Sequence, residues 1–445
     1  MTQPPNPSGE QPPGAVHWSE ARAEGQLRSL ELFGMRFGLD RMRRMMTVLG
    51  SPERAFPAIQ VLGTNGKSST TRMTAAILAR HGLRTGAYTS PHLIAWRERV
   101  LIGERELDAE SFADAIGRAT WAAERVNRTL AEDDHVTQFE LATAAALWEM
   151  AERDVEVAVI EAGLGGRYDA TSVIDAGVTV LTNVGLEHTR WLGPTVTDIA
   201  EEKLAVLSPG AALVLGAGLD PDALAVAERI AAERDAQIRA PEPLGKGVVL
   251  RARGAFQRSN FALARAAAAA HLQGIGSELD EQAVLAAAVE TEVPGRLQLV
   301  GDDPPTILDS AHNPDAVDAL VRSLPQLLGG RPVALVLGVL EDKDAVSMLR
   351  SLIAISERAW FTAPPSGRAL SPAALESQAL RLGFAQTVCE PRPERALRAA
   401  QEWARGRGAA VLATGSVYLV GDLLGRIEGS ARLHGPGIRS GSSPR

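Results

Sequence analysis

Cysteine is almost missing from this chain of 445 residues, in which Cys389 is the single example. An intrachain disulfide is therefore impossible, and nothing in the sequence requires an oxidising compartment. A lone cysteine can act as a nucleophile. Because Cys389 directly follows Val388, we interpret it instead as a small packed residue.

Long apolar runs are missing as well. The run from Val155 to Ile160 is far shorter than the roughly 20 residues that a membrane-spanning helix needs, and the N-terminus has no basic segment followed by an apolar one. Aromatic residues make up 4% of the chain and the formal net charge is −8, which disfavours nucleic-acid binding. These absences favour a cytoplasmic enzyme of small molecules, with neither membrane nor nucleic acid among its partners.

The length predicts two domains. Strand-like runs alternate with helical stretches, as expected of an α/β fold with a mainly parallel sheet, and a second alternation begins after the linker at 292–295. We expect an N-terminal P-loop-type domain at 21–294 and a smaller C-terminal Rossmann-like α/β domain at 295–432. The ends, at 1–20 and 433–445, read as disordered tails rich in small and polar residues.

Individual elements follow from the same patterns. Apolar residues recur at helical spacing from Ser29 to Leu49, interrupted by Gly34 and Gly38, and a helix is expected at 68–81. Strands are expected at 57–62, 155–161, 178–182, 212–215, 305–308, 333–337, 359–362 and 410–413.

A glycine-rich loop lies between the first expected strand and the helix at 68–81. Its sequence, Gly63-Thr-Asn-Gly-Lys67-Ser-Ser-Thr70, is a shortened form of the phosphate-binding loop. Glycines let backbone N–H groups turn toward phosphate oxygens, and the helix N-terminus adds favourable partial charge. Lys67 supplies a positive charge, and Ser68 or Ser69 a hydroxyl. Strand, loop, lysine and hydroxyls together predict a nucleoside triphosphate site rather than a plain strand–helix turn.

Further polar residues follow the strands. Glu161 ends an apolar strand and His188 follows another, so both are expected at the carboxyl edge of the sheet, where a carboxylate can reach a metal ion. Ser90 comes after the loop-helix and offers a hydroxyl. From the residues alone, His188 can equally be a capping histidine, and Lys203 reads as a surface lysine beside two glutamates.

Six segments accompany the phosphate loop in a recognisable order. They are Thr89–Leu93, Phe139–Glu140, Glu161–Thr171, Asn183–His188, Asp309–Pro314 and Gly338–Asp344. With them the chain resembles the folylpolyglutamate synthase/dihydrofolate synthase family of the Mur ligase superfamily, from Gly34 to Gly421. Ser68 departs from the family pattern, which more often has glycine there.

The resemblance implies an ATP-dependent ligase that forms a C–N bond between an acid and an amino acid through an acyl phosphate. The substrates would be ATP, L-glutamate and either dihydropteroate or a reduced folate, with two Mg²⁺ ions, and the chain would be a monomer. Three alternatives stay open. They are a folylpolyglutamate synthase without the dihydropteroate activity, a Mur-type ligase of a cell-wall precursor, and a nucleotide-dependent switch or binding protein with no ligase step.

The resemblance also implies site residues. The metal ligands would be Ser90, Glu161, His188 and Lys203, the last carbamylated by carbon dioxide. ATP would contact Asn65, Gly66, Lys67, Ser68, Asn260 (near the adenine), Arg296 and Asp309. Catalysis would depend on Lys67, Lys203, Arg296 and His312. The folate and glutamate contacts would be Gly34, Met35, Arg36, Thr137, Gln138, Phe139, Glu140, Tyr168, Asp169, Ala170 and Ser416. Phe139 could instead be a core residue, and His312 part of a structural turn before Asn313.

Overall fold

The computed structural model describes residues 17–30 and 38–433, which form two compact units. The first unit contains the residues up to Ser90, then Trp96–Gly247 and Asn260–Ala287. The second contains Pro91–Ala95, Val248–Ser259 and the residues from Ala288 onward. The linker predicted at 292–295 therefore lies inside the second unit.

An eight-stranded sheet forms the centre of the first unit. Its strands are β1 (Ala58–Leu62), β2 (Thr85–Tyr88), β3 (Val100–Ile102), β4 (Arg105–Glu106), β5 (Val157–Glu161), β6 (Ala176–Leu181), β7 (Ala212–Leu215) and β8 (Gln237–Arg239). They lie in the order β4-β3-β2-β5-β1-β6-β7-β8. The six strands from β2 to β8 in this order run parallel, whereas β3 and β4 are antiparallel. The parallel strands end at one edge, where β1, β5 and β6 lie side by side.

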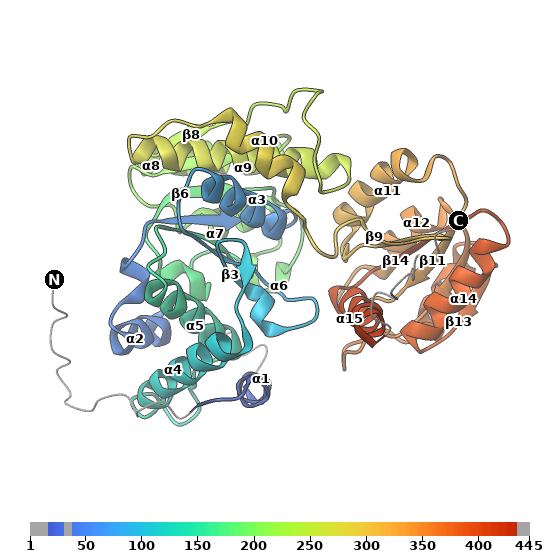
Figure 1. The fold of residues 1–445 in the computed structure, drawn as a ribbon, viewed down its shortest axis with the longest axis horizontal. Coiled ribbons are helices and arrows are strands. Elements are labelled where there is room, and N and C mark those ends of the chain that lie inside the picture. Colours follow the sequence, from blue (N-terminus) through green and yellow to red (C-terminus); the bar gives the residue numbers. More distant parts are fainter. Residues whose placement is uncertain (1–16, 31–37, 434–445) are drawn as a thin grey trace, which may run out of the picture. The chain divides into compact units, whose positions relative to one another are not determined.

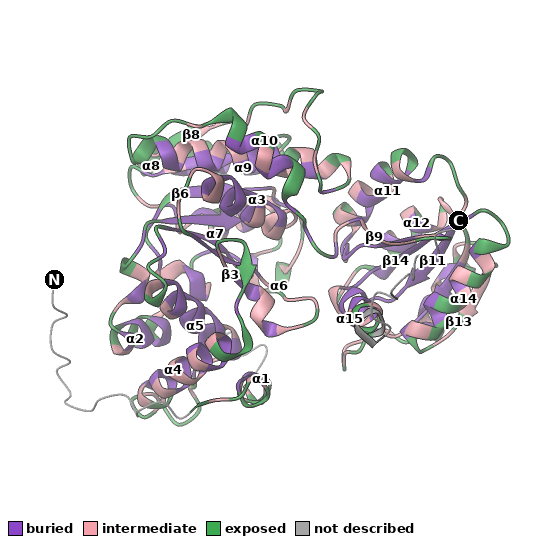
Figure 2. Ribbon diagram, viewed as in Figure 1, coloured by how far each residue is buried: buried purple, intermediate pink, exposed green. Residues whose placement is uncertain are grey.

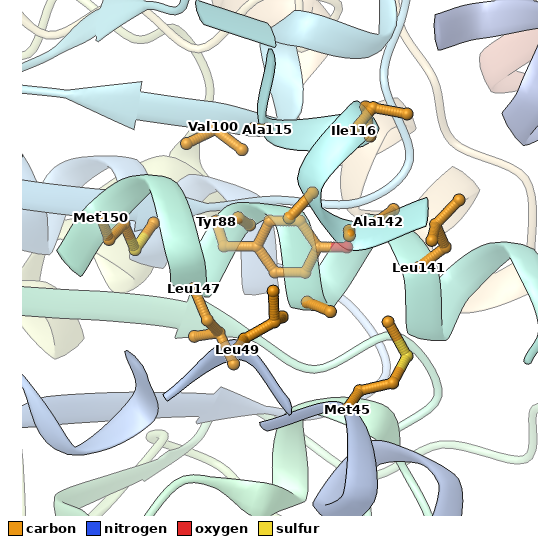
Figure 3. Packing of buried hydrophobic residues seen from close by; sticks show 14 of the residues in the cluster. Met45, Leu49, Tyr88, Val100, Ala115, Ile116, Leu141, Ala142, Leu147 and Met150 are labelled. Carbon is orange, nitrogen blue, oxygen red and sulfur yellow. The ribbon is translucent and has the colours of Figure 1, made fainter. Parts of the chain in front are cut away.

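Helices cover both faces of this sheet (Figure 1). The helices of this unit are α1 (Glu20–Ser29), α2 (Asp40–Leu49), α3 (Lys67–Arg80), α4 (Ala109–Asn127), α5 (Gln138–Glu152), α6 (Thr189–Leu192), α7 (Val196–Leu204), α8 (Pro221–Glu233), α9 (Ala255–Gly274) and α10 (Glu281–Glu290), with short 3₁₀ turns η1 (Pro52–Arg54), η2 (Trp96–Arg99) and η3 (Ala170–Val173). The start of α9, up to Ser259, and the end of α10, from Ala288, belong to the second unit. Helices α1, α2, α4 and α5 share one core with β1, β2 and β5. Tyr88 lies at its centre, surrounded by Met45, Leu141, Leu147 and Met150 (Figure 3).

The second unit is built on a six-stranded sheet. Its strands are β9 (Gln298–Asp302), β10 (Pro305–Leu308), β11 (Val333–Leu337), β12 (Ser356–Phe361), β13 (Thr387–Cys389) and β14 (Ala410–Thr414), and its helices are α11 (Pro314–Leu328), α12 (Ala345–Ile353), α13 (Pro372–Arg381), α14 (Pro393–Arg405) and α15 (Val417–Leu433). The order is β13-β12-β11-β14-β10-β9, with only β9 antiparallel.

Alternate residues of these strands pack into two different hydrophobic cores, one on each face of the sheet. Leu335 and Leu337 pack with α11, α12 and α13, whereas Ala334 and Val336 pack with α14 and α15. Strands buried on both faces read as continuous apolar runs, which is why they were visible in the sequence. Figure 2 shows the burial of the central strands and the exposed outer surfaces of the helices. The predicted α/β class, with two mainly parallel sheets, is confirmed.

The interrupted apolar pattern from Ser29 to Leu49 includes Ser29, the last residue of α1, and the whole of α2, which begins at Asp40, while 31–37 lie outside the described residues. One local expectation was wrong. Cys389 is exposed rather than packed, because it ends the edge strand β13, which has a neighbour on one side only. Of the predicted tails, Glu20 and Leu433 belong to helices, whereas 1–16 and 434–445 lie outside the described residues.

None of the helices within 17–30 and 38–433 is both long enough and apolar enough to span a membrane.

Candidate active site

The phosphate loop connects β1 to α3 and requires glycine at two positions. Gly63 has φ +139°, and a Cβ there would collide with Oγ1 of Thr182. Gly66 has φ +84°, and its Cβ would lie 2.6 Å from Oδ1 of Asn260. A side chain is therefore excluded at both positions by backbone conformation and by space. Asn260, expected near the adenine, lies beside this loop.

Lys67 begins α3 and its ammonium is folded back over the loop. Its Nζ donates to the carbonyl oxygens of Gly63 and Thr64, each at 3.0 Å. Because the lysine is only partly buried, it keeps access to the loop surface. The predicted phosphate contacts Asn65 to Ser68 thus share one turn of chain at the N-terminus of α3, where an anion is favoured.

Glu161 brings three predicted residues together at the carboxyl edge of the sheet. Its carboxylate is 1% exposed. It accepts one hydrogen bond from Oγ of Ser68 at 2.9 Å and another from the backbone N–H of Ser90 at 3.0 Å. A carboxylate and hydroxyls at the end of a phosphate loop are the hard oxygen donors that Mg²⁺ prefers, so these residues fit the predicted ion. Ser68 had been expected only as a phosphate contact.

His188 stands at the start of α6 in the left-handed region, with φ +55°. Its Nε2 lies 4.0 Å from Oε1 of Glu187. Within 17–30 and 38–433, no group of three or more His, Cys, Asp and Glu side chains could hold a metal ion. The predicted ligand set contains only two such residues, Glu161 and His188, and so depends on hydroxyl oxygens and on Lys203.

Lys203 is not a surface lysine, so that alternative is wrong. It lies in the last turn of α7, is 2% exposed, and its Nζ donates to the carbonyl oxygens of Gly63 at 3.1 Å and Leu164 at 2.7 Å. Burial, and then the nearby Lys67 ammonium, lower the pKa of Lys203 from 10.5 to about 7. The carbonyl of Gly63 therefore accepts from both lysines, which joins Lys203 to the phosphate loop.

Most of the predicted folate contacts at the start of α5 are occupied by internal hydrogen bonds. Thr137 and Glu140 form a capping box. Gln138 donates from Nε2 to the carbonyl of Leu27 at 2.7 Å, and the buried Arg41 donates from Nε to both oxygens of Glu140 at 3.0 and 3.1 Å. Sequence reasoning missed Arg41, since a charged residue on a short helix gives no sign that it is buried.

Phe139 differs from these neighbours. Its ring is partly buried, lies 6.3 Å from the ring of Tyr88, and would be 2.7 Å from a Cβ added to Gly163. The ring therefore packs on the loop that follows β5 and leaves part of its surface accessible. Tyr168 in the same loop is 45% exposed. The companion residues Gly34, Met35 and Arg36 lie outside the described residues.

Asp169 organises the loop after β5. Its Oδ2 accepts from the backbone N–H groups of Leu164 and Gly165 at 2.9 and 3.0 Å, and its Oδ1 accepts from the N–H and hydroxyl of Thr171. Ala170, the next residue, is buried in η3. Since Leu164 also accepts from Lys203, the carboxylate of Asp169 helps to place the carbonyl that Lys203 binds.

In the second unit, the predicted segments Asp309–Pro314 and Gly338–Asp344 directly follow β10 and β11, at the carboxyl ends of these strands. Asp309 is 2% exposed and accepts from the N–H groups of Leu297 and Ala311, both at 2.8 Å. Burial raises the pKa of this carboxyl, and the guanidinium of Arg296 opposes the rise. Leu297 has φ +44°, a strained conformation that Asp309 stabilises directly beside Arg296.

The remaining predicted residues of the second unit border the same edge. His312 lies in the loop after β10 and Nδ1 is 3.0 Å from the carbonyl oxygen of Ser310. Ser416 is buried at the start of α15 and accepts from the N–H of Tyr418 at 3.2 Å. The N–H of Gly415 donates to Ala311, which joins the two loops.

Comparison with known proteins identifies the family. The family described as "Mur ligase middle domain" matches residues 61–215, and that described as "Mur ligase, glutamate ligase domain" matches residues 295–417. A dihydrofolate synthase/folylpolyglutamate synthase of Bacillus subtilis is 31% identical over 424 residues, which cover 89% of this chain and 96% of that protein.

Solved structures agree. Mycobacterium tuberculosis folylpolyglutamate synthase complexed with ADP is similar with a TM-score of 0.85 at 28% identity, covering 92% of this chain and 98% of that one. Escherichia coli FolC in complex with DHPP and ADP gives a TM-score of 0.80 at 28% identity, covering 93% and 98%. The chain therefore belongs to the dihydrofolate synthase/folylpolyglutamate synthase family and is an ATP-dependent ligase of the Mur type.

Proposed function

We propose that this chain attaches L-glutamate both to dihydropteroate and to the γ-carboxylate of folates, at the expense of ATP. The observation that carries the proposal is the meeting of the phosphate loop, Glu161 and the buried Lys203 at one edge of the first sheet. The names of the relatives support both activities, and the ADP and DHPP complexes of related structures support the substrates.

The proposed reaction has two steps. An oxygen of the acceptor carboxylate attacks the γ-phosphorus of ATP, the bond to the β-phosphate oxygen breaks, and ADP leaves. The α-amino group of glutamate then attacks the carbonyl carbon of the acyl phosphate, loses a proton, and phosphate leaves as the amide forms. The protein mainly positions these groups and stabilises the growing negative charge, with Lys67 at the phosphate loop and Arg296 in the second unit.

Lys203 is proposed to carry a carbamate. An uncharged amine is required, because its lone pair attacks the carbon of CO₂ and the nitrogen then releases a proton. With a pKa of about 7, roughly half of the Lys203 amines are uncharged at neutral pH. When bound, Mg²⁺ would supply positive charge at the phosphates, and Ser68, Ser90, Glu161, His188 and the Lys203 carbamate are the residues to hold it.

The other assignments remain proposals. Asn65, Gly66, Ser68, Asn260 and Asp309 are assigned to ATP, and His312 to catalysis. The folate is assigned to Thr137, Gln138, Phe139, Glu140, Tyr168, Asp169, Ala170 and the segment 34–36, and glutamate to Ser416. The accessible part of the Phe139 ring supports an apolar contact with a pterin or aminobenzoate ring. A domain boundary at 294/295 is supported by the glutamate ligase match, which starts at residue 295. We also propose a monomeric, cytoplasmic enzyme.

The test is a ligation assay with purified protein, Mg·ATP, L-glutamate and either dihydropteroate or a reduced folate. The readouts are the release of phosphate and the mass of the product. A gain of one glutamate on both acceptors is expected. A gain on the folate alone would leave a folylpolyglutamate synthase. Gain on neither, while Mg·ATP binds, would overturn the substrate assignment. A parallel reaction with a uridine-nucleotide cell-wall precursor tests the other Mur-type activity, and Lys67→Met is the inactive control.

A further inference from the structure

The segment that follows β6 contacts the phosphate loop through hydrogen bonds to which the proposed site assigns no role. Oδ1 of Asn183 accepts from the backbone N–H of Thr64 at 3.2 Å and from that of Asn65 at 2.8 Å. The carbonyl oxygen of Asn183 accepts from the same Thr64 N–H at 3.1 Å. Two converging N–H donors identify the side-chain atom as the amide oxygen rather than the amide nitrogen.

Neighbouring residues extend the contact on both sides. Thr182 donates from Oγ1 to the carbonyl of Asn65 at 2.7 Å. The N–H of Gly185 donates to Oγ1 of Thr64 at 3.0 Å. The side chains of Thr64, Thr182 and Asn183 thus join the loop to the start of the segment 182–188, which ends at His188. We call these three residues the loop clasp.

The N–H groups of the phosphate loop fall into two sets, one bonded to the loop clasp and one available to a phosphate. Those of Thr64 and Asn65 point toward Asn183 and are satisfied inside the protein. The N–H groups of Gly66, Lys67 and Ser68 lie in the first turn of α3 or directly before it, where no intrahelical acceptor exists. These N–H groups can donate hydrogen bonds to the oxygens of a bound phosphate. Because Asn183 is uncharged, it can hold the loop without repelling that phosphate.

We propose that Asn183 is a positioning residue for the nucleotide, acting with Thr64 and Thr182 to hold the phosphate loop in its binding conformation. The proposal rests on the nucleotide site assigned above. Asn183 itself does not contact the phosphates. Its loss is expected to weaken nucleotide binding while the affinity for glutamate stays unchanged, a separation that a general loss of stability would not produce.

Asn183→Ala is the first variant and Asn127→Ala its matched control. Oδ1 of Asn127 accepts from the N–H of Val136 at 2.9 Å, also in a partly buried position of the first unit. Calorimetry with Mg·AMP-PNP should give a Kd raised about tenfold for Asn183→Ala, as expected for two lost hydrogen bonds, and an unchanged Kd for Asn127→Ala. The KM for ATP should rise in parallel, with the KM for glutamate unaltered.

Thr64 provides a second arm that does not depend on the folding of Asn183→Ala. Thr64→Val removes the acceptor of the Gly185 N–H and should weaken nucleotide binding, whereas Thr64→Ser keeps the hydroxyl and should restore it. Equal nucleotide affinity in the wild type, Asn183→Ala and Thr64→Val would overturn the positioning role of the loop clasp and leave the nucleotide site unaffected. Equal weakening by Asn183→Ala and Asn127→Ala would overturn it too. Absence of binding by the wild-type chain would instead overturn the nucleotide site.

Discussion

Replacing Lys203 with methionine is expected to stabilise the folded chain below pH 7. There the amine is protonated in both the folded and the unfolded state, so the folded state bears the full cost of a buried ammonium. The interval between the ordinary pKa of 10.5 and about 7, at about 1.4 kcal/mol for each pH unit, corresponds to a cost of about 5 kcal/mol. The methionine side chain cannot donate to the carbonyls of Gly63 and Leu164, and each lost hydrogen bond lowers the free energy of unfolding by about 1 kcal/mol. The free energy of unfolding of Lys203→Met is therefore expected to exceed that of the wild type by about 3 kcal/mol below pH 7.

The pH dependence provides the sharper test. As pH rises from about 7 to 10.5, the folded state releases the proton while the unfolded chain keeps it, so the stability of the wild type rises. The difference in the free energy of unfolding between Lys203→Met and the wild type should therefore shrink over this interval. Near its upper end the sign should reverse, because the cost of the buried ammonium is gone and the loss of two hydrogen bonds still destabilises the variant.

The measurement is urea unfolding from pH 6 to pH 10 in buffers free of CO₂, so that no carbamate forms. Lys246→Met is the control, because Lys246 is exposed and its replacement should give a difference that does not vary with pH. A constant difference between the wild type and Lys203→Met would refute the reasoning, since it would mean that the folded and unfolded amines titrate together.

Three further predictions concern the same edge of the sheet and the α5 N-terminus. Ligase activity at pH 8 should fall in CO₂-free buffer and return with bicarbonate, and ¹³C-labelled bicarbonate should give a carbamate NMR signal that Lys203→Met lacks. Gly63→Ala should abolish nucleotide binding in calorimetry because its Cβ meets Thr182, whereas Gly177→Ala, with nothing within 4 Å, should not. Glu140→Gln removes one of the two carboxylates that pair with buried Arg41, the other being Asp134, and should lower the free energy of unfolding by about 2 kcal/mol in urea.

Each of these has a contrary result. Full activity after CO₂ removal, with no carbamate signal, would remove Lys203 from the proposed ligands. Normal nucleotide binding by Gly63→Ala would mean that the loop shifts without loss. A cost below about 1 kcal/mol for Glu140→Gln would place the pair with Arg41 among solvent-screened ion pairs.

The sequence determined the α/β class and the phosphate loop. Strands such as β1, β5, β11 and β14 are buried on both faces and therefore appear as apolar runs, and the glycine–lysine–serine pattern specifies its own local geometry. Because parallel strands end at one edge, Glu161 could be placed near Ser68 from its position at the end of a strand. Edge strands and short strands, among them β4, β8 and β13, have no such run and were not predicted.

Only the tertiary structure decided which polar side chains are buried and what they contact. Lys203 and Arg41 look like surface residues in the sequence, and both are buried. Their partners are distant along the chain: Lys203 donates to the loops after β1 and β5, and Arg41 to Glu140 of α5. Thr182 and Asn183 contact the phosphate loop across a sequence separation of 117 and 118 residues, as their hydrogen bonds with Asn65 show. Local patterns carry the backbone conformation and the burial of whole strands. The partner of a single polar group, and hence its pKa and its role, depends on which distant segments the fold brings beside it.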